Sequence, residues 1–79
     1  MTLLEQIIEE IEDLGHIYTD EIDKDTLLKE DLGFSREKIL LVIENIEFRL
    51  DVNLDPIENN FDNNSATVND VLEAIIKER

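Results

Sequence analysis

The 79-residue sequence has no cysteine and no tryptophan, and its only glycines are Gly15 and Gly33. Without cysteine the chain has no disulfide framework, no thiolate metal site and no cysteine nucleophile. Two separated glycines do not make the glycine-rich loop with which many enzymes cradle a phosphate group. Nothing in this composition requires an oxidising compartment, and we therefore expect a cytoplasmic protein.

The sequence also lacks long apolar runs. None approaches the roughly 18 apolar residues that a membrane-spanning helix needs. Glu5, Glu9 and Glu10 stand where a secretory signal peptide would have positive charge and an apolar stretch. We therefore expect neither a membrane span nor a targeting segment.

Positive charge is scarce: 7 lysines and arginines face 21 aspartates and glutamates, which gives a net charge of -14. Self-repulsion of this size favours a soluble monomer and opposes the compact state. It argues against nucleic acid as a ligand, because lysine and arginine bind phosphates. The charge favours protein partners with basic surfaces, reached by electrostatic steering. The alternative is that the acids only solvate the surface.

The apolar residues recur with helical spacing in three segments. The first helix is predicted to begin at Thr2, which forms the capping-box pattern Thr-x-x-Glu with Glu5. Gly15 is predicted to end it in the left-handed conformation. Its apolar stripe consists of Leu4, Ile7, Ile8, Ile11 and Leu14.

Residues 16–34 show no long periodicity, and their scattered apolar side chains predict a structured loop that lies across the helices. These side chains belong to Ile17, Ile22, Leu27, Leu28, Leu32 and Phe34. The second helix is predicted from Ser35 to about Leu50. Its narrow apolar stripe consists of Ile39, Val42, Ile43, Ile46 and Leu50.

A short helix is predicted to begin at Pro56, with Ile57 and Phe61 buried. The last helix is predicted to be capped by Thr67, with Asp70 as the capping-box acid. Its apolar face consists of Val68, Val71, Leu72, Ile75 and Ile76. The prediction is thus one all-α domain over residues 1–79, with three main helices, one short helix and a long first loop.

Short motifs follow one another along the whole chain. An acidic stretch with an apolar pair precedes an Asp-Leu-Gly turn, an alternating apolar segment follows the second helix, and a Thr-Val pair opens the last. The motifs are Asp20-Glu21-Ile22 with Leu27-Leu28, Glu30-Asp31-Leu32-Gly33, Asp51-Val52-Asn53-Leu54 and Thr67-Val68. In this order and spacing the chain resembles an acyl carrier protein.

The resemblance implies an acyl-carrier-protein-like bundle that takes part in fatty acid, polyketide or peptide biosynthesis. Proteins of that family carry acyl or aminoacyl groups as thioesters on a 4'-phosphopantetheine arm attached to a serine. By this resemblance the chain is not itself an enzyme. It docks on basic surfaces of biosynthetic enzymes, which perform the catalysis.

The attachment motif departs from the family pattern. After Asp-Leu-Gly the family has one variable residue and then Asp-Ser-Leu, whose serine holds the arm. Without a gap, Ser35 stands in the aspartate's place, Arg36 in the serine's and Glu37 in the leucine's. Arginine cannot form the phosphodiester, so Ser35 is the candidate attachment residue.

A one-residue deletion would bring Ser35 into the serine's place. That shift would put Asn45 and Arg49 at two of the family's buried positions, and burying them without partners costs several kcal/mol. The gapless register instead fills these positions with apolar residues: Leu40, Val42, Ile43, Ile46 and Leu50. Ser35 therefore lies near the attachment position but not in it, and its role as a plain N-cap is the favoured alternative.

Two functions follow from this departure. In the first, the domain docks on biosynthetic enzymes and carries thioesters on an arm at Ser35. In the second, it is an unmodified acidic interaction module that binds a basic protein partner. Arg36 and Glu37 favour the second function, whereas the turn and the helix plan favour descent from a carrier.

The second helix also carries a candidate docking face. Glu37, Leu41, Glu44 and Phe48 recur at spacings of four, three and four residues, nearly opposite the core stripe, and Glu47 adds a further acid. The resemblance implies that this helix is the main docking surface. The alternative is that Leu41 and Phe48 are buried under the short helix or the long first loop.

Other chemistry finds little support in the sequence. His16 is the only histidine, and without a cysteine or second histidine it is a poor metal ligand or catalytic base. Calcium loops that start at Asp23 or Asp62 fail, because Leu27 or Ala66 occupies the fifth position. We expect no metal site.

The charge generates the first testable prediction. Raising the salt concentration, or adding magnesium, should raise the melting temperature, because the net charge is -14 and ions screen repulsion within a Debye length of about 8 Å at physiological ionic strength. Thermal melts between low and moderate salt test this. A melting temperature that falls or stays constant would contradict it.

Overall fold

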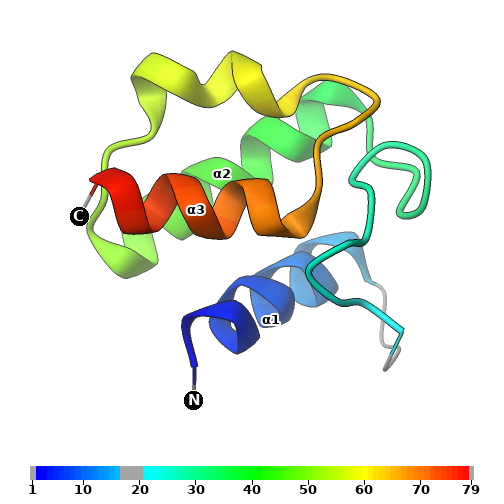
Figure 1. Cartoon of the computed structure of the whole chain (residues 1–79), viewed down its shortest axis with the longest axis horizontal. Helices are drawn as coiled ribbons and strands as arrows, with labels where there is room; N and C mark the ends of the chain where they lie inside the picture. The colour runs from blue at the N-terminus through cyan, green and yellow to red at the C-terminus, as the bar shows by residue number, and fades with distance from the viewer. Residues whose placement is uncertain (1, 17–20, 79) are drawn as a thin grey trace.

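The computed structural model describes residues 2–16 and 21–78, which form three α-helices and a 3₁₀ helix around one apolar core (Figure 1). Helices α2 and α3 occupy the middle of the view, with α1 on one side and η1 on the other. Within these residues there is no strand, and Leu27 and Thr67 form an isolated antiparallel bridge. The radius of gyration is 11.1 Å, close to the value of about 12 Å expected for a compact chain of this length.

Helix α1 spans Leu3–Gly15 and begins with the predicted capping box. Glu5 N–H donates to Thr2 Oγ1 over 3.2 Å, and Thr2 N–H donates to Glu5 Oε1 over 3.0 Å. The bond from Thr2 N–H lowers the pKa of the Glu5 carboxyl. The predicted helix end is wrong by one residue: Gly15 stays helical, and His16 adopts the left-handed conformation with φ of 53°.

Helix α2 spans Arg36–Leu50 and packs against α1, with its start beside the end of α1. Near its start, Lys38 Nζ donates to Leu14 O over 2.9 Å, so it satisfies a carbonyl at the end of α1. Near its end, Arg49 is hydrogen-bonded to Glu10 of α1. Four residues of the predicted stripe are buried: Ile39, Val42, Ile43 and Ile46.

Helix α3 spans Val68–Glu78 and has the predicted capping box. Thr67 N–H donates to Asp70 Oδ2 over 2.8 Å, and Asp70 N–H donates to Thr67 Oγ1 over 3.2 Å. The prediction that Ile76 belongs to the core face is wrong, since its side chain is 60% exposed. It lies about 100° around the axis from buried Ile75, past the edge of the stripe.

The part of the first loop that the structure describes, residues 21–34, is tied to the start of α3. Leu28 N–H donates to Ala66 O over 3.0 Å, and Val68 N–H donates to Thr26 O over the same distance. Ile22, Leu28 and Phe34 anchor the loop in the core, as predicted. The predicted anchor Ile17 lies outside the described residues.

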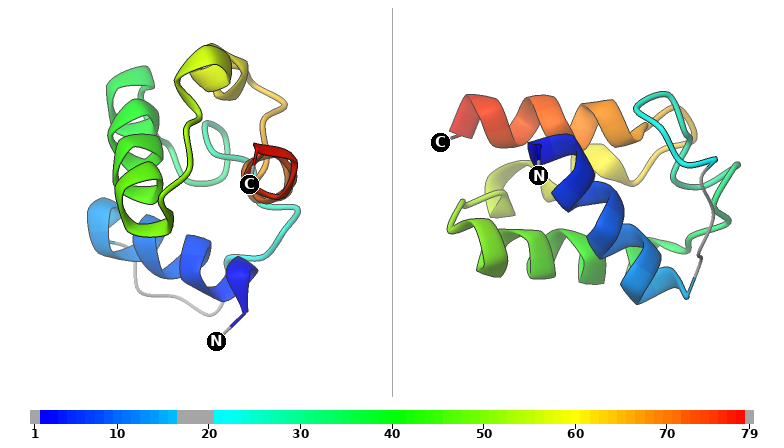
Figure 2. Two further views of the ribbon diagram at one scale, coloured as in Figure 1. Left: turned by 90° about the vertical axis from the view of Figure 1, so that its left-hand side faces the viewer. Right: turned by 90° about the horizontal axis from the view of Figure 1, so that it is seen from below.

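The segment Asp55–Phe61, where a short helix was predicted to begin at Pro56, is a 3₁₀ helix, η1, and not an α-helix. Its first turn is joined by the tight bond from Ile57 N–H to Leu54 O, over 3.0 Å. Phe61 is buried and Ile57 is half-buried, so the segment still covers the core beside α2 (Figure 2).

The three phenylalanines differ sharply in burial. Phe34 and Phe61 are 8% and 2% exposed, whereas Phe48 on the outer face of α2 is 87% exposed. Leu41 on the same face is 43% exposed. The interpretation that Leu41 and Phe48 are buried under the loop or the short helix is therefore wrong.

This contrast generates a prediction. Phe48→Ala should change the free energy of unfolding by less than about 0.5 kcal/mol, as for an ordinary surface substitution. Phe61→Ala should lower it by roughly 3–5 kcal/mol, because it empties a filled core site. Urea unfolding of both variants measures the difference. A large loss of stability in Phe48→Ala would show that this side chain packs in the core.

Candidate functional site

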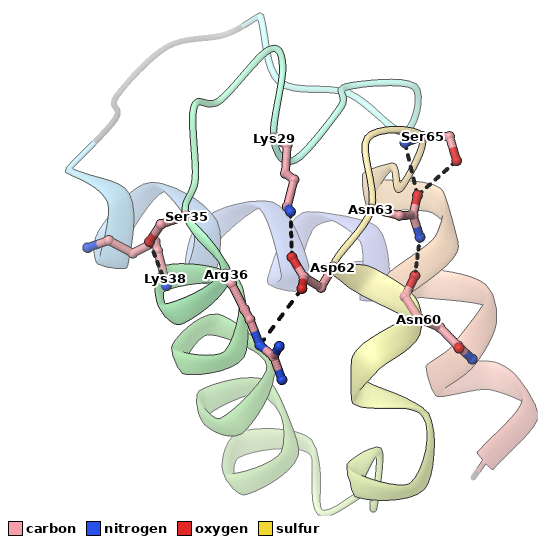
Figure 3. A network of polar contacts seen from close by, with 8 residues as sticks. All are labelled: Lys29, Ser35, Arg36, Lys38, Asn60, Asp62, Asn63 and Ser65. Atoms are coloured by element: carbon pink, nitrogen blue, oxygen red, sulfur yellow. Dashed lines mark hydrogen bonds and ion pairs between the residues drawn. The ribbon is translucent and has the colours of Figure 1, made fainter.

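Ser35, the candidate attachment residue, is the N-cap of α2 (Figure 3). Its Oγ accepts a hydrogen bond from Lys38 N–H over 3.2 Å, and its backbone is extended with φ of -74°. Such a cap stabilises a helix by about 1 kcal/mol. The residue is exposed, so solvent reaches the hydroxyl that caps the helix.

Arg36, which stands in the place of the family's serine, lies beside Asp62 in the turn that follows η1 (Figure 3). Its Nε is 3.8 Å from Asp62 Oδ2, while Lys29 Nζ is 2.5 Å from Asp62 Oδ1. One carboxylate thus lies between two cations from separate segments. The ion pairs join the first loop, the start of α2 and the end of η1.

The second serine, Ser65, lies in a different environment. Its N–H and its hydroxyl both donate to Asn63 Oδ1, over 2.9 and 2.8 Å. Asn63 Nδ2 in turn donates to Asn60 O over 2.5 Å, as Figure 3 shows. These bonds stabilise a local turn between η1 and α3. Ser65 lies in this turn and not at the start of α2.

The predicted docking residues separate into two groups. Glu37, Leu41, Glu44 and Phe48 are all exposed on the outer face of α2. Glu47 is half-buried, and its Oε2 accepts a hydrogen bond from Leu54 N–H over 2.8 Å. Glu47 therefore fixes the chain that leads from α2 into η1. The outer face of α2, defined from here on as Glu37, Leu41, Glu44 and Phe48, remains the candidate surface.

The ion pair between Glu10 and Arg49 was not predicted from the sequence. Glu10 is only 8% exposed, and its hydrogen bond raises the pKa of the Arg49 guanidinium. The sequence does contain a signal for it. Glu10 precedes Ile11 and Arg49 precedes Leu50, so each lies at the border of an apolar stripe, on two helices predicted to pack together.

Residues 2–16 and 21–78 contain no group of three or more acidic, histidine or cysteine side chains that could hold a metal ion. Nor does this described part of the chain include a helix long and apolar enough to cross a membrane. Candidate surface features among the described residues include the start of α2, its outer face and the surroundings of the Glu10–Arg49 pair.

Comparisons with known proteins do not extend this description. No protein-family model matches the chain. No curated protein sequence and no solved structure is significantly similar to it.

Proposed function

We propose that the chain is an acyl-carrier-protein-like docking domain that presents the outer face of α2 to a basic enzyme of fatty acid, polyketide or peptide biosynthesis. The observation that carries this proposal is the exposure of Leu41 and Phe48, at 43% and 87%, in one line with two acids. Phenylalanine is enriched in the cores of protein interfaces, where a partner removes it from water.

The charge of the face fits the same proposal. Glu37 and Glu44 are exposed beside the two apolar side chains, on a chain with a net charge of -14. Acids on the rim of an interface attract a basic partner over distance and raise the rate of association. The apolar side chains then contribute the short-range contact that holds the complex.

This docking role does not require an arm. Arg36 cannot carry one, and its ion pair with Asp62 gives it a structural place in the fold. The unmodified interaction module is therefore the form that the geometry favours. A second candidate, supported by the exposed Ser35 hydroxyl at the start of α2, is a carrier with 4'-phosphopantetheine on Ser35.

The docking proposal predicts the effect of a charge reversal. Glu44→Lys should slow association with the partner enzyme by about tenfold or more at low salt, and by less at high salt, because screening removes the steering. The partner is first identified by cross-linking in the native host and then purified. Its rate of association with each variant is measured by biolayer interferometry. Glu30→Lys, an exposed acid in the first loop, is the charge-matched control. Equal effects of the two variants would rule out the outer face of α2 as the docking surface.

The attachment question has a separate test. A broad-specificity phosphopantetheinyl transferase with coenzyme A should modify the wild-type chain poorly, because Arg36 occupies the family's serine position. Arg36→Ser with Glu37→Leu should raise the modified fraction, measured by intact mass. Any modification that is found in the wild-type chain should be absent from the Ser35→Ala variant. The Ser65→Ala variant should be modified to the same extent as the wild-type chain. Stoichiometric modification of the wild type at Ser35 would establish the carrier function instead.

A further inference from the structure

A groove lies between the middle of α1 and the C-terminal end of α2. It has a volume of about 280 Å³ and is lined by Gln6, Glu9, Glu10, Ile46, Arg49 and Leu50. The outer face of α2 contributes none of these side chains. The groove is thus a separate feature, with walls from two helices.

The charged side chains of the groove carry an excess of negative charge. Arg49 is hydrogen-bonded to Glu10, whose carboxylate therefore balances the guanidinium. Besides this hydrogen bond, the charges of Glu9 and Asp13 also raise the pKa of Arg49. Three carboxylates act on one cation, and the exposed Glu9 lines the groove directly. A cationic group is the complement of these charges.

The size of the groove and its apolar lining indicate which class of cationic group fits it. A volume of about 280 Å³ lies just below the roughly 300–1,000 Å³ of small-molecule pockets, which suits a single extended side chain. Half-buried Leu50 offers apolar surface beside the carboxylates, whereas Ile46, which also lines the groove, is fully buried. Lysine and arginine combine an apolar stem with a cationic head and bind such mixed surfaces.

We propose that the groove between α1 and α2 receives a lysine or arginine side chain of a basic protein partner. The stem packs on half-buried Leu50, and the head pairs with exposed Glu9, whose carboxylate is not the one bonded to Arg49. A second copy of this chain is disfavoured as occupant, because each copy carries a net charge of -14. The inference rests on the proposed function only in that the partner is a basic protein.

A titration without the partner tests the groove directly. Amide ¹H–¹⁵N spectra of the full chain are recorded with n-butylguanidinium chloride, at an ionic strength held constant with sodium chloride. We expect saturable shifts confined to residues 6–10 and 46–50, with millimolar affinity. Glu9→Gln should weaken this affinity about three- to fivefold, the usual effect of one exposed charge pair.

Two controls make the result specific. Glu44→Gln removes the same charge from the outer face of α2 and should leave the affinity unchanged. Pentanoate, an anion with a similar stem, should give no saturable shift. Spectra with magnesium chloride should show no saturation at these residues.

Shifts that never saturate, or that Glu9→Gln leaves unchanged, would overturn the proposal, as would saturable binding of pentanoate. Saturation by magnesium at the same residues would reassign the groove to metal ions. None of these outcomes bears on the docking face, which is tested by Glu44→Lys with the partner enzyme. The two proposals can therefore fail independently.

Discussion

The fold depends on bringing the apolar faces of three helices into one core while the acids on the same helices repel one another. The side chains at the centre are almost fully enclosed: Ile7, Ile11, Ile39, Ile43, Ile46 and Ile75 are at most 1% exposed. Burial of each such side chain contributes about 1.5–3 kcal/mol. An exposed ion pair contributes only about 0–1 kcal/mol. Apolar burial therefore provides the stability, and the cations act mainly on how the segments are placed.

The few cations lie where separate segments meet. The chain has 7 lysines and arginines, and in the described residues four of them join segments that are distant in sequence. These contacts are Lys38 with Leu14 O, Arg49 with Glu10, and Lys29 and Arg36 with Asp62. Helix α2 takes part at both of its ends, and its inner face is buried. Its outer face is left to the solvent, which is why two apolar side chains there favour a binding role.

The sequence was sufficient for the features that are local. Capping boxes at Thr2 and Thr67, the cap at Ser35 and the main core stripes depend on residues three or four positions apart, and all are present. The end of α1 was misplaced because His16 tolerates the left-handed backbone that Gly15 was expected to adopt.

The features that could not be predicted depend on tertiary neighbours. Stripe periodicity alone placed Ile76 in the core, but the width of the contact between helices leaves it in solvent. Whether Phe48 is covered depends on the path of η1, which the sequence does not encode locally. The pairing of Asp62 with Lys29 and Arg36 likewise brings together residues up to 33 positions apart.

The geometry at the start of α2 explains why docking and attachment are separate questions. As an N-cap, Ser35 accepts one hydrogen bond through Oγ while the residue stays exposed, so capping itself does not block a modifying enzyme. Arg36 follows Ser35 directly and places a guanidinium beside Asp62. A transferase that recognises the family's serine position would therefore meet a cation about 100° around the helix axis from the available hydroxyl. Three residues of the outer face of α2, namely Leu41, Glu44 and Phe48, lie outside the attachment motif, so the docking proposed for this face does not depend on an arm.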